Sequence, residues 1–140
     1  MTTGSAGLHV VVPPDRRADF DAVRGFARDV ADLLARRDPG AVTTEQRKDQ
    51  RRGRVFLDTL RNAYAQTAVA PYAIRPRPGA PVAAPIDWEE LARADLGART
   101  YTLRNLFRRL GQKDDPWAGI ARRGRSLDGP RQRLARLVRE

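Results

Sequence analysis

The chain has 140 residues, with 27 basic and 17 acidic side chains and a formal net charge of +10. This length is typical of one domain, and such a basic balance is typical of proteins that meet nucleic acid. There is no cysteine and His9 is the only histidine, which excludes a disulfide framework, a thiolate metal site and a multi-histidine metal site. The apolar run at residues 8–12 is too short for a signal peptide or a membrane span, so we expect a cytoplasmic protein without a membrane partner.

The N-terminal third predicts a strand followed by a helix. Residues 8–12 are rich in β-branched side chains and are stopped by two prolines, which favours a strand. From residues 17–37 the apolar positions recur every three or four residues, as in an amphipathic helix. Asp15 is the expected N-cap, and the Asp-Pro-Gly sequence at residues 38–40 is expected to close the helix.

The middle of the chain predicts two further strands. Residues 44–53 are polar and basic and fit a short helix or a loop. Residues 54–57 favour a strand that ends at Asp58. A short helical or irregular stretch is expected over residues 59–64, and a third strand over residues 67–75.

The C-terminal half predicts a connector and small helices. Residues 75–85 carry four prolines and a glycine, which favours an extended connector. Helices are expected over residues 87–91 and 102–110, with a helical turn near residues 114–117. Apolar residues in the arginine-rich segment 119–140 indicate a last helix. This order of elements predicts an α/β fold with a small sheet.

Three stretches carry a resemblance to a known family. They are Thr-Gly-Ser-Ala-Gly-Leu-His-Val-Val-Val-Pro at residues 3–13, Gly-Arg-Val-Phe-Leu-Asp-Thr-Leu-Arg-Asn at residues 53–62, and the long segment at residues 66–82. Together they resemble the second motif, the third motif and the following segment of the polymerase domain of bacterial ligase D. That domain has an archaeo-eukaryotic primase-type fold. The similarity covers roughly residues 3–117.

The resemblance implies a fold class and a division of the chain. We expect an α/β fold: a partial primase-type (RRM-like) fold with a small mixed sheet, one long helix and several short C-terminal helices. Residues 1–118 would form the C-terminal half of the polymerase domain, and residues 119–140 a basic, arginine-rich tail.

The resemblance also implies a metal site. Nucleotidyl transfer in this family uses two divalent metal ions, Mn or Mg, held by three aspartates, and Asp58 matches the one in the third motif. The alternative interpretation is that Asp58 is a structural aspartate at a strand end or a helix cap. The family's aspartate pair belongs upstream of Thr3. The pairs Asp19–Asp21 and Asp114–Asp115 of this chain fit helix starts better, where acidic side chains are favoured.

A nucleotide site is implied by the same motifs. By resemblance, Thr3 and Ser5 belong to a glycine-containing loop that binds phosphate. The family usually has a basic residue where this chain has Ala6, so one direct phosphate contact is lost. His9 matches the histidine that hydrogen-bonds the incoming nucleotide, although a core histidine is the other reading.

Two arginines, Arg51 and Arg75, match triphosphate contacts of the family. Arg61 stands where many relatives have a polar residue near the nucleotide. For each of the three, a solvated surface arginine is the alternative interpretation. The arginines of the segment 119–140 favour a sequence-independent attraction to phosphate backbones.

The sequence leaves three functions open. The first is a truncated or split end-joining repair polymerase, with NTP or dNTP as substrate, that is inactive alone. Its partners would be DNA ends and a separate chain carrying the N-terminal half, a DNA ligase or an end-binding protein. The second is a non-catalytic, basic DNA-end-binding module. The third is a degenerate remnant or a mis-assigned start.

Overall fold

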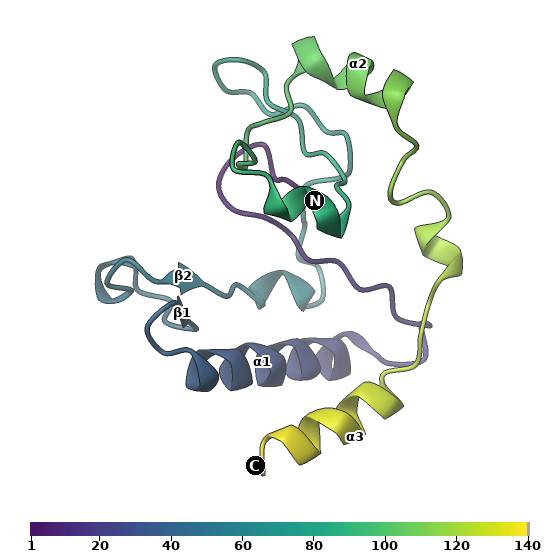
Figure 1. Cartoon of the computed structure of the whole chain (residues 1–140). Helices are drawn as coiled ribbons and strands as arrows, with labels where there is room; N and C mark the ends of the chain where they lie inside the picture. The colour runs from purple at the N-terminus through teal and green to yellow at the C-terminus, as the bar shows by residue number, and fades with distance from the viewer. Residues whose placement is uncertain (140) are drawn as a thin grey trace. The chain divides into compact units, whose positions relative to one another are not determined.

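The computed structural model describes residues 1–139 and contains three α-helices, four short 3-10 helices and two short strands in that range (Figure 1). The chain divides into two compact units. The first unit combines Met1–Pro13 with Ala68–Arg123, and the second combines Pro14–Thr67 with the residues from Gly124 on. Among the described residues, no helix is both long and apolar enough to cross a membrane.

The long helix of the second unit is α1 (Phe20–Arg37), which confirms the helix predicted from the apolar spacing. Its N-cap is Asp19, whose carboxylate accepts a hydrogen bond from a backbone N–H of the first turn (2.8 Å). The prediction that Asp15 is the N-cap of this helix is therefore wrong. The Asp15 carboxylate instead accepts from the backbone N–H of Arg17 (3.2 Å) and holds the turn before the helix.

The sheet of the second unit has two parallel strands, β1 (Val42–Thr43) and β2 (Val55–Phe56). The strand β2 lies inside the predicted strand at residues 54–57 and confirms it. The strand β1 was not predicted, because two residues carry too little pattern. Between the strands lies the 3-10 helix η1 (Lys48–Gln50).

The second unit is closed by the C-terminal helix α3 (Asp128–Leu137), which lies against α1 (Figure 1). Leu33 of α1 and Leu134 of α3 are both buried. The Arg131 guanidinium donates to the backbone carbonyl of Ala22 (2.9 Å), which adds a polar tie between the helices. The predicted last helix is thus confirmed.

The first unit has a small apolar core, to which the proline-rich connector contributes two residues. Its buried members are Val82, Ala84, Tyr101 and Leu106. Thr2 is fully buried beside this core, and its backbone N–H donates to the carbonyl of Ala84 (2.9 Å). The N-terminal segment is therefore fixed to the connector.

Three short helices follow the connector. They are η3 (Trp88–Ala92), α2 (Leu103–Gln112) and η4 (Ile120–Arg122). Both η3 and α2 begin with a capping box, in which Asp87 and Thr102 are the N-caps. The predicted helices at residues 87–91 and 102–110 are confirmed, and the α/β class with them.

Two predicted strands are wrong. Residues 8–12 contribute only an isolated bridge from Leu8 to Thr2, and residues 67–75 only one from Ile74 to Val82. A strand needs a neighbour for its backbone groups, and within residues 1–139 no ladder forms beside residues 9–12. In the second case Tyr72 takes a left-handed φ of 63°, so a turn interrupts the extended run.

Candidate active site

The loop at residues 3–7, here called the glycine loop, is folded by its own first side chain. The hydroxyl of Thr3, a buried residue, donates to carbonyl groups at the far end of the loop (3.0 and 3.1 Å). It also accepts from the backbone N–H of Ser5 (3.2 Å). Gly4 and Gly7 have φ of 63° and 73°, a region that glycine enters without strain. Thr3 thus shapes the loop predicted to bind phosphate.

Arg75 lies directly against this loop. A Cβ atom on Gly4 would lie 2.7 Å from Cγ of Arg75 and 3.2 Å from the carbonyl carbon of Val82, so only glycine allows this approach. The backbone N–H of Arg75 donates to the carbonyl of Pro81 (2.8 Å) and fixes its position. Two predicted site residues that are distant in sequence, Thr3 and Arg75, therefore belong to one small region of the first unit.

The Arg75 guanidinium has an unused donor. Its Nε is buried and has no hydrogen-bond partner within residues 1–139. Buried polar atoms are nearly always paired, so this donor is unusual. A guanidinium offers its donors in a planar fork that fits phosphate oxygens. The role of Arg75 as a triphosphate contact stays a prediction.

A second arginine reaches the glycine loop and was not predicted. Nε of Arg99 donates to the carbonyl of Ser5 (3.0 Å), and the N–H of Gly4 donates to the carbonyl of Ala98 (2.8 Å). No sequence signal marks Arg99, because it is one exposed arginine among many. Its hydrogen-bond partner, Ser5, lies 94 positions earlier in the sequence.

His9 stands at the end of the glycine loop, half-buried. Its backbone N–H donates to the carbonyl of Met1, and the terminal ammonium of Met1 donates to the carbonyl of His9 (2.9 Å each). Burial lowers the pKa of that ammonium, against the raising effect of Glu90. These backbone bonds hold His9 in place beside the loop.

Asp58 follows β2 as predicted and is exposed. One oxygen of its carboxylate accepts from the backbone N–H of Leu60 (3.0 Å), at the start of the 3-10 helix η2 (Leu60–Asn62). Within residues 1–139, no three His, Cys, Asp or Glu side chains form a group that would hold a metal ion. Asp58 thus forms a local turn just before η2, whose N-cap is Thr59, and its metal role stays a prediction.

Arg51 is fixed by its own segment. Its guanidinium donates to the carbonyls of Glu45 (3.0 Å) and Gln46 (2.7 Å) and lies 3.8 Å above the centre of the Phe56 ring. This places the side chain against β2, with part of its donor fork already used.

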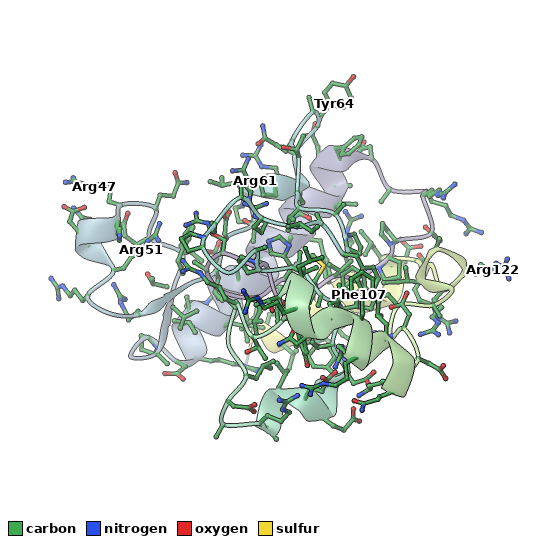
Figure 2. The ribbon with its side chains drawn as sticks, turned by 90° about the horizontal axis from the view of Figure 1, so that it is seen from above. Arg47, Arg51, Arg61, Tyr64, Phe107 and Arg122 are labelled. Atoms are coloured by element: carbon green, nitrogen blue, oxygen red, sulfur yellow. The ribbon has the colours of Figure 1, made fainter. Side chains whose placement is uncertain are left out.

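Arg61 in η2 is exposed and donates to the Gln66 side chain (3.1 Å). Figure 2 labels Arg51 and Arg61, and shows the ring of Tyr64 directed outward from the same stretch of chain as Arg61. The Tyr64 ring meets Phe20 edge to face, with 5.5 Å between ring centres. Arg61 is thus an exposed cation on a segment that packs against α1.

The predicted site residues fall into two groups. The first unit holds Thr3, Ser5, His9 and Arg75, and the second unit holds Arg51, Asp58 and Arg61. The first group gathers at the glycine loop. The second lies on or beside β2 and η2.

In each of the two other aspartate pairs, one carboxylate makes structural hydrogen bonds. Asp19 caps α1. Asp115 accepts from the backbone N–H of Trp117 (2.9 Å) and from the hydroxyl of Tyr72 (2.7 Å). Burial and this bond to a carboxylate raise the pKa of Tyr72.

A buried carboxylate, missed by sequence reasoning, links η3 to α2. Glu90 is 7% exposed and accepts from the hydroxyl of Tyr101 (2.7 Å) and from Arg109 (2.5 and 2.8 Å). Burial opposes the charge, but the hydrogen bonds from Arg109 and Tyr101 outweigh it and lower the pKa of Glu90 to about 2. Lys113 completes the network through its ion pair with Asp87.

Comparison with known proteins gives concordant matches. Residues 1–117 match the family model of the LigD primase-polymerase domain. The chain is 38% identical over 140 residues to the multifunctional non-homologous end joining protein LigD of Pseudomonas aeruginosa, covering 99% of this chain and 16% of that protein. It is 41% identical over 96 residues to the LigD protein of Mycolicibacterium smegmatis, covering 69% of this chain and 13% of that protein.

A solved structure agrees with the sequence matches. The polymerase domain of Mycobacterium tuberculosis ligase D, in complex with DNA, superposes with a TM-score of 0.73 at 29% identity. The match covers 81% of this chain and 39% of that one. The fold is thus that of an end-joining polymerase domain. The chain belongs to the LigD primase-polymerase domain family, and it spans a small part of the length of the relatives that it matches.

Proposed function

We propose that this chain supplies the nucleotide-binding side of a two-metal nucleotidyl-transfer site in an end-joining repair polymerase. The observation that carries the proposal is the Arg75 side chain, whose Cγ lies against Gly4 of the glycine loop and whose buried Nε has no hydrogen-bond partner within residues 1–139. Family membership adds the reaction class, and the net charge of +10 suits polyanionic substrates.

The triphosphate of an NTP or dNTP is the ligand that fits this loop. Arg75 would donate to phosphate oxygens through its guanidinium fork, and Ser5 would offer its hydroxyl at the loop. Thr3 keeps the loop folded, and His9 is positioned to bond the nucleotide. Arg51 and Arg61 belong to the second unit, and their contact with the nucleotide rests on the family resemblance.

Divalent Mn or Mg is the implied cofactor. Such hard cations take carboxylate oxygens, and Asp58 has one oxygen beyond the one that accepts from the Leu60 N–H. When bound, such metal ions would neutralise charge at the transferring phosphate and would activate the attacking hydroxyl. Asp58 would hold one side of such a metal.

A two-metal site needs more carboxylates than Asp58 alone. Within the described residues no suitable cluster exists, so we expect residues 1–140 by themselves to bind nucleotide without extending a primer. The missing carboxylates would come from polypeptide that carries the N-terminal half of the domain. DNA ends would be the second substrate, and a DNA ligase or an end-binding protein would act with them.

The test combines binding with activity. Calorimetric titration of ATP into the 140-residue chain should show a higher affinity with Mn than without it, and Asp58→Asn should abolish that gain. Asp114→Asn, an exposed aspartate in the first unit, is the matched control. Primer extension by the chain alone would contradict the expected inactivity, and an unchanged Mn effect in Asp58→Asn would contradict the metal role.

A non-catalytic DNA-end-binding module is the second candidate. It is favoured by the exposed arginines on and after α3, which are Arg131, Arg133, Arg136 and Arg139. Binding through phosphates weakens steeply with salt. Steep, salt-dependent binding of DNA ends without any ATP binding would favour this second function over the first.

A further inference from the structure

The turn at residues 97–100 is stiffened by its own hydrogen bonds. The Thr100 hydroxyl accepts from the N–H of Gly97 (2.7 Å) and donates to the carbonyl of Asp95 (3.1 Å). The Asp95 carboxylate is itself paired with Arg93 (2.7 Å). Arg99 therefore extends from a defined turn whose nearby carboxylate is already occupied.

This turn is attached to the glycine loop at two points. The N–H of Gly4 donates to the carbonyl of Ala98 (2.8 Å), and Nε of Arg99 donates to the carbonyl of Ser5 (3.0 Å). A guanidinium held by Nε alone keeps its two terminal nitrogens available for another acceptor. The bond to Ser5 thus brings an exposed cation to the surface of the loop.

The glycine loop has two cations and no anion of its own. Within residues 1–139, neither Arg75 nor Arg99 forms an ion pair, and the loop residue Ala6 is uncharged. Both arginines contact the same five-residue loop, Arg75 at Gly4 and Arg99 at Ser5.

We propose that Arg99 is a second phosphate-binding residue of the glycine loop, which works with Arg75 to hold the polyphosphate of a nucleotide. The inference rests on the proposed nucleotide-binding function and adds a residue to it. Two guanidinium groups on one loop would bind a ligand with several adjacent phosphates better than a monophosphate, because each fork needs its own pair of oxygens.

The experiment measures three ligands on the full chain: ATP, AMP and inorganic tripolyphosphate. Arg99→Ala should lower the affinity for ATP and for tripolyphosphate about tenfold, the range for a lost charge-assisted hydrogen bond, and change AMP binding much less. Arg104→Ala removes an exposed arginine on α2 of the same unit and serves as the matched control. Equal affinity of the wild type and Arg99→Ala for tripolyphosphate would overturn the proposal.

Arg99→Gln separates the charge from the support of the loop. A glutamine amide retains a donor for the Ser5 carbonyl but has no charge, so we expect it to bind tripolyphosphate as weakly as Arg99→Ala does. Thermal unfolding verifies that each variant is folded. Wild-type affinity in Arg99→Gln would mean that Arg99 only supports the loop, which overturns the proposal.

A second-site change provides a positive test. Ala6 is exposed and adjoins Ser5, so Ala6→Lys should return a cation to the loop and raise the tripolyphosphate affinity of the Arg99→Gln chain. The two proposals fail differently. Loss of ATP binding in Arg75→Ala but not in Arg99→Ala sinks this inference alone, whereas a wild-type chain that binds neither ATP nor tripolyphosphate sinks the nucleotide-binding function with it.

Discussion

At the scale of single residues, Glu90 has the largest effect expected on stability. Its carboxylate is buried among Arg109 and Tyr101, and the Arg109 side chain is only 12% exposed. Breaking a buried ion pair leaves an uncompensated charge. Glu90→Gln should therefore lower the free energy of unfolding by about 3 kcal/mol in urea denaturation. Glu89→Gln, the exposed neighbour, is the control and should change it little.

The same carboxylate predicts a pH dependence. The pKa of Glu90 is lowered from 4.5 to about 2 in the folded chain. A depressed pKa gives stability that is fully present above pH 4.5 and is lost as the pH falls toward 2. Unfolding measured across this window should show a loss of about 3 kcal/mol that Glu90→Gln lacks. If the wild type and Glu90→Gln lost the same unfolding free energy as the pH fell, the pH dependence could not be assigned to Glu90.

Gly4 and Gly7 form a natural pair for comparison in the glycine loop. Gly4→Ala places a Cβ 2.7 Å from Cγ of Arg75, whereas a Cβ at Gly7 meets nothing within 4 Å. Both changes carry the left-handed φ cost of about 1 kcal/mol. Only Gly4→Ala should also displace Arg75 and weaken ATP binding. Equal ATP affinities in the two variants would show that the close contact between Arg75 and Gly4 does not contribute to ATP binding.

At the scale of elements, the helices could be predicted because their signals are local. The spacing of apolar residues fixed α1, and Asp87 and Thr102 mark the starts of η3 and α2. The strands could not be predicted as well, since a ladder depends on a neighbour that local sequence does not specify. The spacing of apolar residues also identifies the apolar face of a helix, but it does not show whether another part of the protein covers that face. In α2 only Leu106 is buried, while Phe107 is 70% exposed.

The cap of α1 is a prediction at this scale. Asp19→Ala should lower the free energy of unfolding by about 1 kcal/mol, because it removes the acceptor for the first turn. Asp15→Ala, at the position first expected to be the cap, should cost less. A larger loss of unfolding free energy for Asp15→Ala than for Asp19→Ala in urea denaturation would contradict the observed start of α1.

At the scale of the whole molecule, the sequence could yield candidate site residues only where they lie in contiguous motifs. Thr3, His9, Asp58 and Arg75 each stand in a stretch that resembles the family. Contacts made across distant segments could not be found this way. The approach of Arg75 to Gly4, the reach of Arg99 to Ser5 and the Glu90 network all depend on tertiary packing.

The central claim is that this chain binds the phosphates of a nucleotide at the glycine loop. Calorimetric titration of ATP into the wild type and into Arg75→Ala tests it most directly, with the exposed Arg77→Ala as the control. We predict saturable binding by the wild type and by Arg77→Ala, and an affinity about tenfold lower or more in Arg75→Ala. Equal ATP affinities in all three chains, or no binding by the wild type, would contradict it.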